Sequence, residues 1–209
     1  VYENLMPTYD QTEQPTDRED GETTHFTVAD KYGNVVSYTT TIEQVFGSAI
    51  MVPGYGIILN NELTDFDAVP GGANEVQPNK RPLSSMTPTI VFDDGKPVLT
   101  VGSPGGTTII TSVLQTIINA IEYEMDLEDA LEEPRIYTNN LSSYRYEAGI
   151  PSSVIKQLND MGHGFDPSST TIGNVNSILI DHEKGIFTGV SDTNRNGAAI
   201  GVELKGKGK

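Results

Sequence analysis

A long apolar helix between two groups of short β-rich segments constrains the fold more than any other feature of the chain. Apolar residues recur at helical spacing along TTIITSVLQTIINAI, residues 107–121. The segments before it are TTHFTVAD, NVVSYTTT, YGIILN, MTPTIVF and KPVLTVG, and those after it are NVNSILID, GIFTGVSD and AAIGVEL. Strands grouped around helices predict a mixed α/β (α+β) fold, in which stacked sheets are covered by helices.

Turn signals divide these segments. Gly33-Asn34 predicts a hairpin between the first two strands, and residues 93–95 (Asp-Asp-Gly) predict a second one. Two shorter helices are expected at residues 126–133, which end before a proline, and at residues 151–161, which begin at one.

The composition changes abruptly at Thr23. Residues 1–22 hold seven acidic residues and one basic residue, with little periodicity, which is typical of a solvated linker. A β-rich stretch follows at once. We therefore expect one compact domain that starts at or beside Thr23, which the length of 209 residues allows.

Charge and composition exclude several classes of function. The net charge is −16, so the surface should repel phosphate backbones and anionic lipid. No apolar run approaches the roughly 20 residues that cross a bilayer, so we expect either a cytosolic chain or a targeting segment that lies elsewhere. Cysteine is absent, and the three histidines lack the spacing of metal ligands. We expect no nucleic-acid or membrane partner, no metal and no cysteine nucleophile.

The chain has no cysteine and no convincing Ser-His-Asp arrangement. A hydrolytic site would therefore need a different base. A threonine at a chain terminus supplies one, because its own α-amine can accept the hydroxyl proton. That amine titrates near ~7.7 to 8.0. Thr23 fits if the bond from Glu22 is cut, although a threonine pair at a strand start by itself indicates only β propensity.

Five motifs occur in order between Thr23 and Glu203: TTHFTVADKYGNVVSYTTT, GIILNNELTDF, NKRPLSSMTPTIV, GSPGG and NVNSILID. Together they resemble the small subunit of bacterial γ-glutamyltranspeptidases, in particular the secreted Bacillus enzymes. The resemblance implies the αββα four-layer sandwich of N-terminal nucleophile hydrolases. It also implies a precursor that cuts itself before Thr23. Residues 1–22 would then be the acidic tail of the large subunit, and residues 23–209 the catalytic small-subunit domain.

The resemblance gives roles to individual residues. Thr23 is the nucleophile, and Thr41 hydrogen-bonds its hydroxyl. The backbone amides of Gly105 and Gly106 form the oxyanion hole, which agrees with glycines that open a helix. Side chains bind the two charged groups of the γ-glutamyl substrate: Ser84 and Ser85 the α-carboxylate, and Glu43, Glu62 and Asp65 the ammonium group.

The chain departs from the family pattern in places. Some relatives carry Asn and Gln at the positions of Glu43 and Glu62. The segment from Asp65 to Arg81 is shorter than in relatives whose lid loop covers the pocket, so we expect an open site. His25 lies two residues from the nucleophile and is expected to point to the same side of the strand; a structural role is favoured, with assistance in processing as the alternative.

The resulting prediction is a γ-glutamyltransferase and glutathione hydrolase without a cofactor. Its substrates would be glutathione and other γ-glutamyl compounds, its product glutamate or a γ-glutamylated amino acid or peptide, and its partner the large subunit. The resemblance implies an extracellular protein. Two alternatives stay open: a capsule-type enzyme that cuts or transfers poly-γ-glutamate, and an unprocessed, inactive, zymogen-like binding protein.

Overall fold

A long hairpin opens the part of the chain that the computed structural model describes, which comprises residues 21–139, 143–193 and 197–202. Its strands are β1 (Gly21–Ala29) and β2 (Val35–Gln44). In the turn, Gly33 has a φ of 89°, and the Asp30 carboxylate accepts a hydrogen bond from the backbone N–H of Asn34. The predicted hairpin is confirmed.

A four-stranded antiparallel sheet forms the second β layer, in the order β10-β9-β6-β5. Positive φ angles at Asp94 and Gly95 close the turn between β5 and β6, as predicted. The strands are β5 (Thr89–Asp93), β6 (Lys96–Gly102), β9 (Asn176–Asp181) and β10 (Ile186–Ser191).

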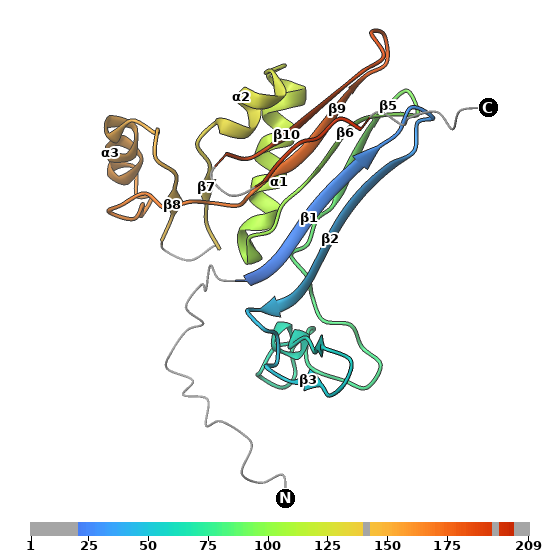
Figure 1. The fold of residues 1–209 in the computed structure, drawn as a ribbon. Coiled ribbons are helices and arrows are strands. Elements are labelled where there is room, and N and C mark those ends of the chain that lie inside the picture. The colour runs from blue at the N-terminus through green and yellow to red at the C-terminus, as the bar shows by residue number, and fades with distance from the viewer. Residues whose placement is uncertain (1–20, 140–142, 194–196, 203–209) are drawn as a thin grey trace, which may run out of the picture.

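The central strand β6 shows how the layers stack, because its side chains alternate between two faces. Leu99 and Val101 pack against helix α1 (Ile109–Ile117), while Thr100 meets Thr27 of the hairpin on the other face. The layers therefore run helix, sheet, hairpin (Figure 1). The α+β class is confirmed, and three of the four expected layers lie within the described residues.

The core lies between the sheet and the helices. Helix α1 continues into a π-helical turn (Ile118–Glu122), and α2 (Leu127–Glu132) follows it. Both helices were predicted. The buried apolar cluster comprises Leu99, Val101, Ile109, Val113, Leu127, Leu131 and Val175. No helix among the described residues has the length and apolar character needed to span a bilayer.

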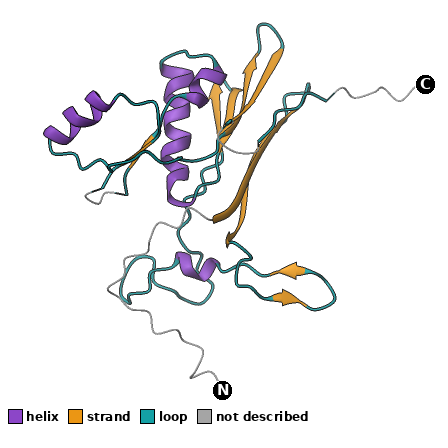
Figure 2. Cartoon of the chain, turned by 60° about the vertical axis from the view of Figure 1, so that its left-hand side comes forward, coloured by secondary structure: helices purple, strands orange, loops and turns teal. Residues whose placement is uncertain are grey.

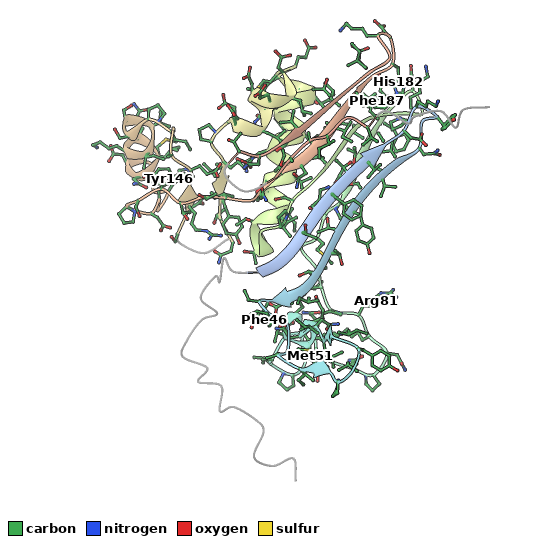
Figure 3. The ribbon with its side chains drawn as sticks, in the orientation of Figure 1. Phe46, Met51, Arg81, Tyr146, His182 and Phe187 are labelled. Carbon is green, nitrogen blue, oxygen red and sulfur yellow. The ribbon has the colours of Figure 1, made fainter. Side chains whose placement is uncertain are left out.

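Two smaller lobes flank the layers. One contains the short pair β3 (Met51–Val52) and β4 (Ile57–Ile58) and the 3₁₀ turn η1 (Glu62–Asp65), below the end of β2; Phe46, Met51 and Arg81 lie in it (Figures 2 and 3). The other contains β7 (Ile136–Tyr137), β8 (Arg145–Tyr146) and the predicted helix α3 (Ser152–Asp160).

Several sequence predictions need correction. The strand expected at residues 55–60 is reduced to the pair in β4, and β5 begins at Thr89, after Pro88, which has no N–H to donate. Residues 198–202 of the expected last strand form no ladder; Ile200 and Val202 are exposed, so no sheet face holds them. The hairpin starts at Gly21, two residues before the proposed boundary, and residues 1–20 of the expected linker lie outside the described residues.

Candidate active site

Two threonine hydroxyls meet at one end of the hairpin. Thr23 and Thr41 are paired across β1 and β2, and Thr23 Oγ1 donates a hydrogen bond of 2.9 Å to Thr41 Oγ1. The same Thr41 oxygen accepts the backbone N–H of Glu43 at 2.8 Å. The structure thus brings the expected nucleophile together with its expected partner, and it orients the proton of Thr23 toward Thr41.

The backbone is irregular beside this pair. The register of the hairpin shifts between Gly21 and Thr23, so the bulge lies opposite the Glu22–Thr23 peptide bond. On the facing strand, Glu43 has a φ of 72°, a conformation that costs a non-glycine residue free energy. This strain turns the end of β2 and redirects the Glu43 side chain.

Three carboxylates gather where β2 ends. Glu43 and Asp65 both act electrostatically on Glu62, which lies at the start of η1. Asn61 joins them, because its Nδ2 donates to Glu43 Oε2 while its Oδ1 accepts the backbone N–H of Gln44 at 3.0 Å. The sequence predicted the acids but missed Asn61. Its position directly before Glu62 in NNEL was the available signal.

The pKa of Glu62 reflects its position in this cluster. Burial, and next the negative charge of Asp65, raise the pKa of Glu62 to about 7. Its Oε1 is buried and has no hydrogen-bond partner among the described residues. A positively charged group bound between these acids would relieve their repulsion, so the cluster is suited to an ammonium ion.

The glycine loop lies between β6 and α1. Gly105 and Gly106 have φ angles of 136° and 55°, which favour glycine, and a Cβ on Gly105 would lie 2.6 Å from Thr108 Oγ1. Ser85 Oγ donates to the Gly106 carbonyl at 2.7 Å, and Ser84 Oγ accepts the N–H of Met86. The serine and glycine pairs are therefore neighbours, at the start of a helix where N–H groups favour negative charge.

The threonine pair and the glycine loop lie at the same end of the layers. In two views the beginning of β1 is beside the N-terminal end of α1, which the glycine loop precedes (Figures 1 and 2). The hairpin also contacts β6 directly: Thr27 Oγ1 lies 2.7 Å from Thr100 Oγ1, and Ser37 Oγ donates to the Val101 carbonyl. The Thr23–Thr41 hydroxyl pair, the acidic cluster and the glycine loop thus belong to one scaffold.

A buried ionic cluster around Arg135 supports the segment that contacts the glycine loop. The sequence did not predict this cluster. Arg135 is 2% exposed; its Nη1 lies 2.6 Å from Asp192 Oδ2 and donates to the Ile172 carbonyl. The following segment reaches the loop, since the N–H of Asn174 donates to Ser103 Oγ at 2.8 Å. Arg135 therefore fixes a support of the loop through contacts distant in sequence.

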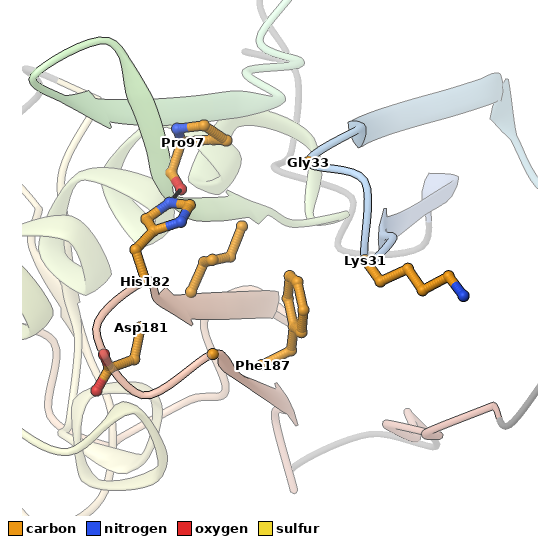
Figure 4. Close-up of a pocket in the computed structure, with 8 residues that line it drawn as sticks. Lys31, Gly33, Pro97, Asp181, His182 and Phe187 are labelled. Atoms are coloured by element: carbon orange, nitrogen blue, oxygen red, sulfur yellow. Dashed lines mark hydrogen bonds between the residues drawn. The ribbon is translucent and has the colours of Figure 1, made fainter.

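His182 lies away from this site. His182 is in the turn after β9, and its Nε2 lies 2.8 Å from the Pro97 carbonyl oxygen. A surface hollow of about 230 Å³ surrounds it, lined also by Lys31 and Phe187, at the end of the hairpin that carries the Gly33 turn (Figure 4). Among the residues described, no three His, Cys, Asp or Glu side chains converge as a metal site.

Comparisons with known proteins agree on one family. The sequence profile of the γ-glutamyltranspeptidase family matches residues 3–202. A glutathione hydrolase proenzyme of Bacillus subtilis (strain 168) is 70% identical over 206 residues, which are 99% of this chain and 35% of that protein. The chain thus spans about a third of the length of this curated relative.

Solved structures extend this likeness to the fold. A threonine-to-alanine mutant of Helicobacter pylori γ-glutamyltranspeptidase has a TM-score of 0.77 and 42% identity, covering 82% of this chain and 100% of that chain. A Bacillus anthracis transpeptidase is more distant, with a TM-score of 0.70 and 27% identity, covering 86% and 99%.

Proposed function

Because this chain belongs to the γ-glutamyltranspeptidase family, we propose that it is the catalytic small-subunit part of an enzyme that hydrolyses and transfers γ-glutamyl groups. The observation that carries this proposal is the hydrogen bond between the hydroxyls of Thr23 and Thr41 beside the acidic cluster. The substrates are glutathione and other γ-glutamyl compounds, and the acceptors are water, amino acids and short peptides.

The enzyme first processes itself. Thr23 Oγ1 attacks the carbonyl carbon of Glu22, the peptide C–N bond breaks, and the acyl group passes from nitrogen to oxygen as an ester. Water then cleaves the ester, which leaves a carboxylate on Glu22 and a free amine on Thr23. The bulge at this bond and the strained Glu43 opposite it support the proposal. The Bacillus subtilis relative is likewise named a proenzyme.

Turnover uses the same oxygen. Thr23 Oγ1 attacks the γ-carbonyl carbon while the α-amine of Thr23 accepts its proton, and the backbone amides of Gly105 and Gly106 stabilise the oxyanion. The amine then protonates the leaving nitrogen, and a γ-glutamyl ester remains on Thr23. Water releases glutamate from it, and an amino acid or peptide amine takes the group as a new amide.

Both charged groups of the γ-glutamyl substrate are attached to its α-carbon, so the serine pair and the acidic cluster would bind neighbouring groups at the same end of the substrate. Ser84 and Ser85 bind the α-carboxylate, next to the start of α1. Glu43, Glu62 and Asp65 bind the ammonium group, because the cluster lacks a cation of its own among the described contacts. This arrangement selects a glutamyl group by both of its charges.

The rest of the precursor supplies the partner. We assign residues 1–22 to the tail of a large subunit and residues 23–209 to the catalytic domain, since the curated relative is about three times as long as this chain. The proposal includes secretion, as the resemblance to extracellular Bacillus enzymes implies; comparing the culture medium with the cell lysate tests it.

Intact mass of the purified full-length precursor tests the proposal most directly. Two pieces that part between Glu22 and Thr23 are expected, together with release of the chromophore from a γ-glutamyl anilide. Thr23→Ala should stay uncut and inactive, whereas Thr24→Ala, a matched control one residue on, should be cut. A single stable piece without activity would instead support the zymogen-like binding protein.

A capsule-type poly-γ-glutamate enzyme is the second candidate, favoured by the segment after Asp65. Asn74 Nδ2 donates to the Asp65 carbonyl, and Lys80 Nζ donates to the Ala73 and Glu75 carbonyls. These hydrogen bonds all join residues within the segment 65–80, which is therefore folded on its own backbone. A segment folded on its own contacts supports the open site that the sequence predicts, from which a polymer chain could trail.

A further inference from the structure

The imidazole of His25 occupies a space that Gly102 leaves open. His25 lies on β1 two residues after Thr23 and is only 4% exposed. Gly102 is the last residue of β6, and a Cβ on it would lie 2.6 Å from His25 Nε2 and closer still to Nδ1 and Cε1. A side chain at Gly102 would therefore have to displace the ring.

His25 is fixed from the hairpin through its ring and from the sheet through its backbone carbonyl. His25 Nδ1 lies 2.8 Å from Thr39 Oγ1, directly across the hairpin. The side-chain amide of Asn176, which pairs with Gly102 in the sheet, donates to the His25 carbonyl at 3.2 Å. His25 thus joins β1, β2, β6 and β9 at the end where Thr23 lies.

Gly102 leads directly into the glycine loop. Only Ser103 and Pro104 separate it from Gly105, and both are buried, with Ser103 Oγ held by Asn174. A shift of the ring would therefore change the position of Thr23 relative to this short, fixed segment. In catalysis by an oxyanion hole, that relative position sets the stabilisation of the transition state.

We propose that His25 is a positioning residue, whose ring is a spacer between the strand that carries Thr23 and the loop that carries the amides of Gly105 and Gly106. This inference rests on the proposed function. The spacer needs the size of the ring and no proton chemistry. Burial lowers the pKa of His25 to about 4, so the ring is neutral at working pH, and its Nε2 has no hydrogen-bond partner among the described residues.

Substitutions in the full precursor separate a spacer from an acid–base group. His25→Ala removes the ring and Gly102→Ala displaces it, and each should lower kcat for a γ-glutamyl anilide by about 100-fold, with little change in KM. His25→Phe keeps a ring without nitrogens and should retain kcat within about tenfold. The pH limbs of kcat/KM should stay in place. Gly201→Ala, whose Cβ would meet nothing, is the matched control.

Three kinetic results would overturn the inference: an inactive but folded His25→Phe, a pH limb lost in His25→Ala, or a normal kcat in Gly102→Ala. Crystal structures give an answer independent of activity. Gly102→Ala should move the ring and the start of β1, and an unmoved ring refutes the spacer. If the parent precursor lacks γ-glutamyl activity, the proposed function fails, but this structural comparison still tests His25. Should Gly102→Ala not fold, the contrast between His25→Ala and His25→Phe decides.

Discussion

Asn61 offers a sharp test of the acidic cluster, because one side chain ties two parts of it together. Its Nδ2 donates to a carboxylate oxygen of Glu43, and its Oδ1 accepts the N–H of Gln44 at 3.0 Å. Asn61→Ala removes both bonds. Glu43 would lose the partner that holds its carboxylate near Glu62 and Asp65, and the end of β2 would keep the backbone hydrogen bond from the N–H of residue 61 to the Ile42 carbonyl.

The magnitude follows from the kind of bond lost. A hydrogen bond to a charged group contributes about 1.5 to 3 kcal/mol, and a neutral one about 1 kcal/mol. Since Asn61 and Glu43 are both only partly buried, we expect a loss near the lower end. A change of about 2 kcal/mol corresponds to about 30-fold in kcat/KM. Most of it should be a rise in KM, because the ammonium group is bound equally in the ground and transition states.

Steady-state kinetics on a γ-glutamyl anilide, with the processed full-length protein, measures this effect. Asn34→Ala is the matched control, since Asn34 is hydrogen-bonded in the turn at the other end of the hairpin and should leave KM unchanged. A folded, processed Asn61→Ala protein with the parent KM would refute the bridging role. Loss of processing as well would show that the side chain is needed for more than substrate binding.

Three further predictions follow from the charges and the open site. The raised pKa of Glu62 means that the folded state holds this proton more tightly than the unfolded state, so the unfolding free energy should fall as pH rises from about 4.5 to about 7; denaturant titrations of Glu62→Gln should lack this fall. Arg135→Met should cost about 3 to 5 kcal/mol of stability by removing the positive charge that the buried Asp192 carboxylate contacts, whereas Lys156→Met, from an exposed pair, should cost almost nothing in thermal unfolding. On poly-γ-glutamate, chain-length analysis should show free glutamate released one unit at a time; rapid fragmentation would favour the capsule-type enzyme, and no action would refute the open site.

Local sequence patterns predicted the hairpin and its consequences well. The turn at Gly33 fixes the register of the strands, and this register pairs Thr23 with Thr41. The apolar stripe of α1 and the turn at Gly95 were predicted for the same reason, because neighbours along the chain decide them. The α+β class follows from these elements.

Contacts between distant segments were beyond such patterns. Nothing near Arg135 in sequence indicates that Asp192 will neutralise it, and nothing near Gly102 indicates that its missing side chain makes room for His25. Residues 198–202 of the expected last strand also form no ladder, although β10 is an edge strand of the sheet. Asn61 was missed because its role depends on the turn at Glu43.

Strand β1 runs through Glu22 and Thr23, so its pairing with β2 determines what the proposed self-cleavage would leave in place. Every residue from Thr23 to Ala29 has a partner on β2, and upstream of the bulge the one described residue, Gly21, pairs with Gln44. Cutting the bond would therefore leave the downstream strand anchored to β2. The carbonyl carbon of Glu22 and the γ-carbonyl carbon of a substrate would occupy the same place at the Thr23 oxygen. In the proposed mechanism the chain would thus be the first occupant of its own acyl site, and maturation would vacate that site for later substrates.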